Sequence, residues 1–144
     1  MKRVYAKEKV CIGCRLCEIW CRTEHSKSKN IIKAHKKEFP RPMARVLVEE
    51  AIPVSFAIQC RHCDEPACVE SCITGALTKE ESGRVAYNEA KCVGCWTCVL
   101  VCPYGAPQRD LARKKIAKCD LCPDRLIPAC VEMCPNRALV YEER

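Results

Sequence analysis

Sixteen cysteines, in four groups of four, dominate this sequence. Each group begins with two cysteines separated by two residues and ends with two separated by three residues. The groups are Cys11, Cys14, Cys17 and Cys21; Cys60, Cys63, Cys68 and Cys72; Cys92, Cys95, Cys98 and Cys102; and Cys119, Cys122, Cys130 and Cys134. A pattern repeated four times along 144 residues is an internal repeat, and it predicts a chain built from related small units.

The cysteines have to supply much of the stability. The apolar fraction of 49% includes them, and the remaining large apolar side chains are too few for an ordinary hydrophobic core in a chain of this size. Residues 1–11 lack the apolar region of a secretory signal peptide, and no stretch is long and apolar enough to span a membrane. We therefore expect a cytoplasmic protein without direct membrane insertion. Its cysteines should be reduced, which favours metal binding over disulfides.

The spacing within the groups predicts iron–sulfur clusters. A C-x2-C-x2-C-x3-C run is the established sequence of two-cluster ferredoxins, in which three cysteines bind one [4Fe-4S] cluster and the fourth binds the other. Groups one and three have this spacing, and Pro103 follows group three. Groups two and four have a longer gap before the third cysteine but keep both ends. Four groups predict four [4Fe-4S] clusters, with iron bound through the cysteines and with no catalytic residue.

The alternative of another class is a structural zinc-binding scaffold, because paired C-x2-C motifs also build four-cysteine zinc sites. A zinc site has no use for the third cysteine of groups one and three, so the spacing favours iron–sulfur clusters.

The formal charge of +7 raises the question of a nucleic-acid partner. Sixteen thiolates set against four cationic cluster cores would bring that charge close to zero. We expect no nucleic-acid function.

Short elements are predicted between the groups. Residues 75–88 contain two short apolar runs around a Ser-Gly turn, the pattern of a β-hairpin. Short strands are expected at 3–5, 45–49 and 138–141, and short helices at 67–71 and 96–101, with another within 25–38. This gives an α+β fold with nested, ferredoxin-like units of the bacterial 2[4Fe-4S] type. Residues 1–24 with 103–144 would form the outer unit and 60–102 the inner unit, with 25–59 as a basic insertion.

Several polar residues could bear on function. Five lysines between positions 27 and 37 predict either a solvated face or a docking surface for an acidic partner. His25 and His35 lie in the same insertion, and we expect both to be solvated. His62, between two cysteines, is expected to be exposed or hydrogen-bonded. Asp64 and Glu65 in group two predict a lower potential for the cluster bound there.

The cysteine motifs resemble those of the four-cluster ferredoxin-like subunits of bacterial and archaeal redox complexes. The segments CIGCRLCEIWC, QCRHCDEPACVESCITGAL, KCVGCWTCVLVCPYGA and KCDLCPDRLIPACVEMCPNRAL carry the resemblance, which runs nearly end to end. The compact length and the segment HSKSKNIIKA most resemble the iron–sulfur proteins associated with CO dehydrogenase, the CooF type.

The resemblance implies crossed ligation, in which the fourth cysteine of each group binds a cluster shared with another group. Cluster 1 would take Cys11, Cys14, Cys17 and Cys134; cluster 2 Cys21, Cys119, Cys122 and Cys130; cluster 3 Cys60, Cys63, Cys68 and Cys102; and cluster 4 Cys72, Cys92, Cys95 and Cys98.

The resemblance also implies a function in anaerobic electron transport, as a non-catalytic subunit of an oxidoreductase complex. The implied catalytic partner is CO dehydrogenase, or else a tungsten aldehyde oxidoreductase, a formate dehydrogenase or a hydrogenase. A flavin-dependent NAD(P) oxidoreductase or a hydrogenase is the implied acceptor.

Overall fold

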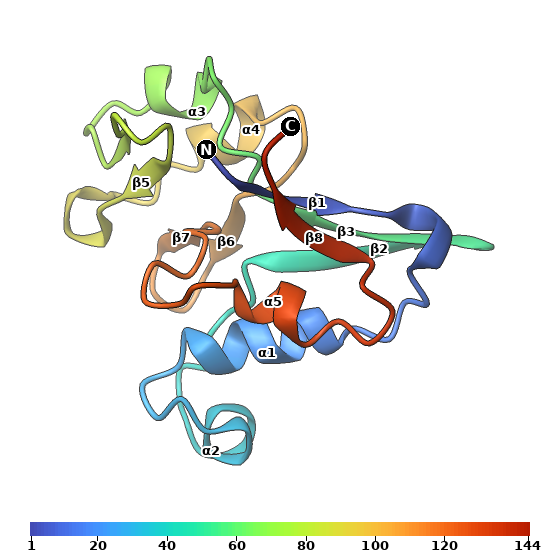
Figure 1. The fold of residues 1–144 in the computed structure, drawn as a ribbon. Coiled ribbons are helices and arrows are strands. Elements are labelled where there is room, and N and C mark those ends of the chain that lie inside the picture. Colours follow the sequence, from blue (N-terminus) through green and yellow to red (C-terminus); the bar gives the residue numbers. More distant parts are fainter.

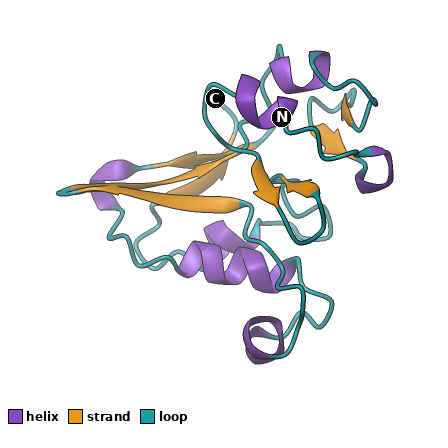
Figure 2. Ribbon diagram, turned by 180° about the vertical axis from the view of Figure 1, so that it is seen from behind, coloured by secondary structure: helices purple, strands orange, loops and turns teal.

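The structure, a computed structural model, describes all residues from 1 to 144 and has the α+β architecture expected from the sequence. Eight short strands form four antiparallel pairs, and short helices and loops connect them (Figure 2). The pairs are β1 (Arg3–Ala6) with β8 (Leu139–Glu142), β2 (Val46–Ala51) with β3 (Val54–Gln59), β4 (Leu77–Lys79) with β5 (Val85–Tyr87), and β6 (Gln108–Asp110) with β7 (Lys115–Ala117). The helices are α1 (Leu16–Glu24), α2 (Ile31–Lys36), α3 (Ala67–Glu70), α4 (Thr97–Val101) and α5 (Ala129–Glu132), with 3-10 turns η1 (Glu8–Val10) and η2 (Glu89–Lys91).

The sequence repeat is also a structural repeat. In groups one and three a 3-10 turn precedes the first cysteine, and a helix begins just before the third. Arg15 and Trp96, with φ of 59° and 62°, take the same left-handed conformation immediately before α1 and α4. In groups two and four the same four residues, Ala-Cys-Val-Glu, form α3 and α5. The helices predicted at 67–71 and 96–101 are confirmed.

The two ends of the chain meet in one sheet. β1 pairs with β8 in antiparallel register, with Val4 opposite Tyr141 and Ala6 opposite Leu139. Both strands were expected from the sequence and are confirmed. Figure 1 shows that this pairing places the N-terminus close to the C-terminus, while α1 and α5 lie side by side on the other side of β2. The first and last cysteine groups are thereby brought together.

Cysteines form part of both hydrophobic cores. The larger core contains Cys17, Cys21 and Cys130 among the apolar residues Val4, Ala44, Val46, Val48, Ala57, Leu121 and Leu139. The smaller contains Cys98 with Leu77, Val85 and Ile116. Strands from the insertion thus pack in the larger core, and Ile116 of β7 packs with residues of the expected inner unit. The division of the chain into outer and inner units stays a prediction.

Two hairpins support the cysteine loops. The β2–β3 hairpin lies over the group-one loop, where the Ser55 hydroxyl donates a hydrogen bond to the Cys11 carbonyl over 3.1 Å. The β6–β7 hairpin does the same for group three, where the Lys115 ammonium donates to the Cys92 carbonyl. The hairpin predicted over 75–88 is confirmed as β4–β5, and the strand predicted at 45–49 as β2. The sequence did not predict β3, β6 or β7.

The basic insertion contains the expected short helix. The Asn30 side chain caps α2 by accepting hydrogen bonds from the Ile32 and Lys33 N–H groups, each at 3.1 Å. None of the helices is long and apolar enough to cross a membrane.

Candidate metal centres

Cys11, Cys14, Cys17 and Cys134, the expected ligands of cluster 1, surround one cavity. They come from the group-one loop, α1 and the segment just after α5, and Ile12, Val48 and Leu139 form part of the apolar wall. The space between the lining atoms is about 410 Å³, the open mouth included. Three thiols from one end of the chain and one from the other face the same space.

The expected ligands of cluster 4 surround a second cavity. Cys92, Cys95 and Cys98 line it together with Cys72 from group two, and Trp96 and Ile116 form part of its wall. Its volume is about 340 Å³, measured in the same way. The two cavities are alike in having four thiols and mostly apolar walls.

The thiols expected to bind clusters 3 and 2 influence one another's pKa. Burial and the neighbouring thiols of Cys60 and Cys102 raise the pKa of Cys63 and of Cys68. Burial raises the pKa of Cys130 still further, and Cys119, Cys21 and Cys122 add to that rise. These thiols therefore lie near one another, and their assignment to clusters 3 and 2 stays a prediction.

Thiols of different sets also influence one another. Each set of four cysteines is numbered here after the cluster that it is expected to bind. Burial raises the pKa of Cys130, Cys119 and Cys98, and each also responds to a thiol of a neighbouring set. Cys130 of set 2 responds to Cys17 of set 1, Cys119 of set 2 to Cys60 of set 3, and Cys98 of set 4 to Cys68 of set 3. Thiols of sets 1 and 2, of sets 2 and 3, and of sets 3 and 4 therefore lie near one another.

Backbone N–H groups point at several of these sulfurs. Arg45 donates to Cys21 over 3.1 Å, Ala138 to Cys134 over 3.2 Å, and His62 to Cys60 over 3.4 Å. Such hydrogen bonds stabilise the thiolate form and tune the potential of a bound cluster.

The thiols suit a cationic iron–sulfur core. Burial raises the pKa of Cys17 to about 12 and that of Cys98 and Cys122 to about 11, so as free thiols they would be protonated at neutral pH. A metal core deprotonates such thiols and compensates their charge. Sets of four thiols in apolar surroundings fit [4Fe-4S] clusters, although four thiols alone would also suit zinc.

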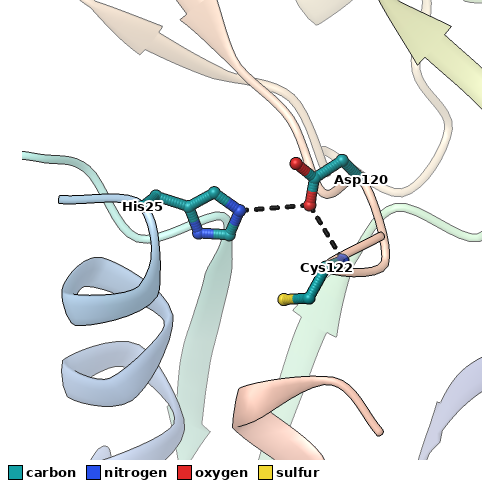
Figure 3. A group of neighbouring side chains, drawn as sticks. All are labelled: His25, Asp120 and Cys122. Atoms are coloured by element: carbon teal, nitrogen blue, oxygen red, sulfur yellow. Dashed lines mark hydrogen bonds and ion pairs between the residues drawn. The ribbon is translucent and has the colours of Figure 1, made fainter. Parts of the chain in front are cut away.

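A polar network surrounds set 2. His25 Nε2 lies 3.1 Å from the Asp120 carboxylate, which also accepts a hydrogen bond from the Cys122 N–H at 3.0 Å (Figure 3). Burial disfavours the charged form of His25 and by itself would lower its pKa. The hydrogen bond to Asp120 and the contact with Cys21 outweigh burial and raise the pKa of His25 to about 9. The expectation that His25 is solvated was wrong, because α1 ends against the group-four loop.

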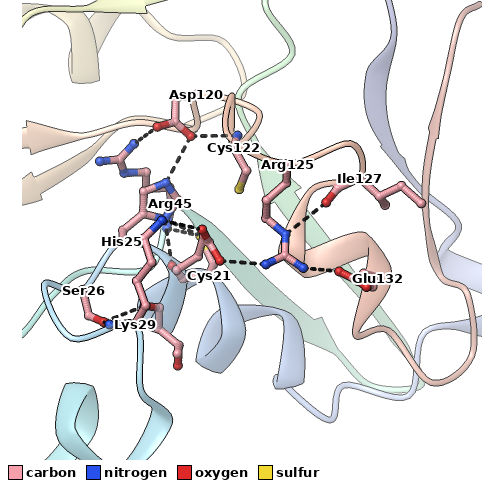
Figure 4. A network of polar contacts seen from close by, with 12 residues as sticks. Cys21, His25, Ser26, Lys29, Arg45, Asp120, Cys122, Arg125, Ile127 and Glu132 are labelled. Atoms are coloured by element: carbon pink, nitrogen blue, oxygen red, sulfur yellow. Dashed lines mark hydrogen bonds and ion pairs between the residues drawn. The ribbon is translucent and has the colours of Figure 1, made fainter.

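The same network extends to α5. Arg45 pairs with Asp120 at 2.5 Å, and Arg125 pairs with Glu132 of α5 (Figure 4). Arg125 also pairs with Glu24 of α1 at 2.9 Å. His35 is also partly buried, with Nε2 3.3 Å from the Ile19 carbonyl, so its expected solvation was wrong too.

His62 is fully buried. Its Nδ1 accepts a hydrogen bond from the Val85 N–H over 3.0 Å, which leaves the proton on Nε2, an atom without a hydrogen-bond partner in the protein. Burial, with the charge of Lys118 second, lowers the pKa of His62 to about 3. The expected hydrogen bond is confirmed, and the side chain is neutral at physiological pH.

Comparison with known proteins identifies the family. Residues 53–144 match the family described as the 4Fe-4S dicluster domain. The chain belongs to this 4Fe-4S dicluster family. Membership selects iron–sulfur clusters over the zinc alternative and makes the protein an iron–sulfur electron-transfer protein rather than an enzyme.

Individual relatives of this dicluster protein are electron-transfer proteins or subunits of reductases. The B subunit of anaerobic dimethyl sulfoxide reductase from Escherichia coli (strain K12) is 36% identical over 139 residues, covering 91% of this chain and 68% of the relative. Electron transport protein HydN of the same strain is 33% identical over 157 residues, covering 98% of this chain and 87% of the relative. The finer resemblance to CO dehydrogenase-associated proteins stays a prediction.

A solved structure shares the fold. The active site complex BamBC of benzoyl coenzyme A reductase aligns with a TM-score of 0.51 and 24% identity, covering all of this chain and 79% of that one. At this identity the likeness concerns the fold alone.

Proposed function

We propose that this protein is a four-cluster electron relay, in which each of the four thiol sets holds one [4Fe-4S] cluster. The observation that carries the proposal is the pairing of cysteines distant in sequence, such as Cys134 with the three cysteines of the group-one loop. A cluster, when bound, takes up and passes on electrons one at a time. The protein supplies the thiolates, the hydrogen bonds to sulfur and the apolar walls that exclude water.

The ligands follow the crossed scheme. Cys21 would leave its own group and join Cys119, Cys122 and Cys130, because α1 carries it towards α5. Cys102 and Cys72 would be exchanged in the same way between groups two and three. The proximity of sets 1 and 2, 2 and 3, and 3 and 4 supports a single path through the molecule, with sets 1 and 4 at its two ends.

The crossed scheme has a direct test. Cys21→Ser should damage cluster 2 while leaving cluster 1 intact, although Cys21 lies in the same motif as the ligands of cluster 1. Cys134→Ser is the matched variant and should damage cluster 1 instead. EPR spectra of the reduced variants report which signal is lost. Loss of cluster 1 alone in the Cys21 variant would reject the scheme.

The partner we propose is a catalytic redox subunit. The relatives named above support this class, since one of them is a subunit of a reductase. CO dehydrogenase is the partner that the sequence resemblance suggests first, and an aldehyde oxidoreductase or formate dehydrogenase follows. The proposed acceptor is a soluble NAD(P) oxidoreductase or hydrogenase, and the proposed location is the cytoplasm.

The function is tested by anaerobic reduction. The oxidised protein is mixed with a catalytic amount of each candidate enzyme and its substrate: CO with CO dehydrogenase, an aldehyde with aldehyde oxidoreductase, formate with formate dehydrogenase. The physiological partner should bleach the broad visible absorbance within seconds. Failure of a dithionite-reducible protein to exchange electrons with any redox enzyme would contradict a relay function.

A further inference from the structure

Lys118 is a buried cation whose position no cysteine motif explains. Only 2% of the residue is exposed. Its ammonium donates hydrogen bonds to the carbonyls of Val85 at 2.7 Å and Cys119 at 2.9 Å. An ammonium has three N–H groups, so these two carbonyls leave one donor unused.

This buried charge has no carboxylate partner. The structure contains thirteen ion pairs, and none of them includes Lys118. The neighbouring acidic residue, Asp120, is engaged by Arg45 and His25. Removing an ammonium from water without a counter-charge is costly, and buried lysines are therefore normally paired. An anionic group outside the set of protein side chains would remove this cost.

Lys118 lies between two of the thiol sets. Through Cys119, the next residue, it adjoins set 2. Through Val85 it is linked to His62, which lies between Cys60 and Cys63 of set 3. One ammonium therefore lies close to residues of both sets.

We propose that Lys118 is the resident counter-charge of clusters 2 and 3 and that it raises the reduction potential of both. The inference rests on the proposed function for its cluster assignments. Each bound cluster, with its four thiolates, is anionic and becomes more negative on reduction. A fixed positive charge nearby stabilises the reduced form, and inside the protein neither water nor salt screens it effectively. Asp64 and Glu65, which were expected to lower the potential of this cluster, are exposed, and Asp64 pairs with Arg3, so their charges contribute little there.

The chain contains a matched control. Lys91 precedes Cys92 as Lys118 precedes Cys119, but Lys91 is exposed at the surface. The two lysines have the same place in the motif and differ in burial. An exposed charge is screened by solvent and contributes little.

The experiment is an EPR-monitored redox titration of the intact protein and of the Lys118→Gln, Lys118→Arg and Lys91→Gln variants. Lys118→Gln keeps a hydrogen-bond donor and loses the charge. It should lower the potentials of the signals from clusters 2 and 3 by about 60 mV, which is a tenfold change in the one-electron equilibrium. The reduction potentials of clusters 1 and 4 should not change. Lys118→Arg should largely restore the two potentials, and Lys91→Gln should leave all four unchanged.

Unchanged potentials in a Lys118→Gln variant with full iron and sulfide content would overturn the inference, as would equal shifts of all four signals. If that variant does not assemble, pulsed EPR of the protein with Lys118 intact and labelled with ¹⁵N-lysine decides. Lys79 also donates to the Cys63 carbonyl of set 3, so the labelled protein carries Lys79→Gln. Coupling to a lysine nitrogen is expected in the signals of clusters 2 and 3, and its absence there would overturn the inference. An unsubstituted protein without four clusters would instead refute the proposed function.

Discussion

Asp120 connects three segments that surround set 2. Its carboxylate accepts from the Cys122 N–H within its own loop, from His25 at the end of α1 and from Arg45 just before β2. Burial works against ionisation, but the hydrogen bond from His25 and the Arg45 charge outweigh it and hold the pKa of Asp120 well below its usual range. The carboxylate therefore links the end of α1 and the segment before β2 to the group-four loop.

Replacing Asp120 by Asn should loosen this site. The substitution removes the negative charge that Arg45 and His25 share. Because the Asp120 side chain is 34% exposed, we expect a loss of about 1–2 kcal/mol, less than for a fully buried pair. The thermal midpoint of the cluster-loaded protein should fall by several degrees, with cluster 2 lost first.

Asp124→Asn is the control for that measurement, since Asp124 is an exposed carboxylate in the same loop. Its midpoint should match that of the unsubstituted protein. Equal midpoints for the Asp120 and Asp124 variants would show that the network does not stabilise the site.

The residues of this network could not be identified from the sequence. Two histidines in a basic segment suggested solvent exposure, and only the packing of α1 against α5 reveals that one of them reaches the group-four loop. Lys118 was equally hidden, because the sequence Lys-Cys occurs at both 91–92 and 118–119. Burial distinguishes the two lysines, and burial depends on tertiary structure.

Each three-cysteine loop fits closely under its hairpin. Gly94, between Cys92 and Cys95, has a φ of +71°, and a Cβ at that position would collide with the Lys114 carbonyl in the β6–β7 turn. At Gly13 in group one, a Cβ would instead meet the flexible Glu50 side chain, 3.1 Å away. The group-three loop is therefore the more rigidly constrained of the two.

Gly94→Ala should displace the loop or the hairpin and prevent assembly of cluster 4. The expected result is about twelve irons per chain in place of about sixteen, with the EPR signal of cluster 4 missing. Colorimetric iron analysis and EPR provide the measurement.

Gly105→Ala separates the collision from backbone strain. Gly105 has a φ of +60°, and no atom lies within 4 Å of the added Cβ. This variant should lose about 1 kcal/mol of stability and keep all its iron. Equal iron content in the Gly94 and Gly105 variants would contradict the proposed fit.

Local signals decide which elements could be predicted. The Ser-Gly turn identified β4–β5, and strand patterns at the chain ends identified β1 and β8. The β6–β7 hairpin was not predicted because its turn, Leu111–Lys114, contains no Gly, Pro or Asn. The turn is held by the Asp110 carboxylate, which accepts from the Arg113 N–H at 3.1 Å, a weak sequence signal.

At the scale of the molecule, the fold depends on contacts between distant parts of the chain. The four strand pairs are not joined into one sheet, and cysteines occupy positions in both cores. The spacing predicted the four groups and a fourth cysteine that binds another cluster, but which groups exchange it came only from the family resemblance. Spacing within a group determines a loop, whereas exchange between groups depends on how α1, α5 and the terminal strands pack.

Removal of the clusters should therefore unfold the protein. Burial alone leaves the cysteine thiols protonated and the small cores without a cross-link, so the pairing of β1 with β8 should be lost. Oxidation and chelation of the iron should abolish most of the far-UV circular dichroism and make the chain sensitive to protease. Reconstitution with iron and sulfide is the control and should restore both properties. A protease-resistant apoprotein would contradict this view of the core.

The central claim is that the sixteen thiolates hold four iron–sulfur cubes. Its most direct test is the metal and acid-labile sulfide content of anaerobically purified protein, with Mössbauer spectroscopy to identify the cluster type. The account predicts about sixteen irons and sixteen sulfides per chain, all in [4Fe-4S] form. A colourless protein that carries zinc, or no metal, would contradict it.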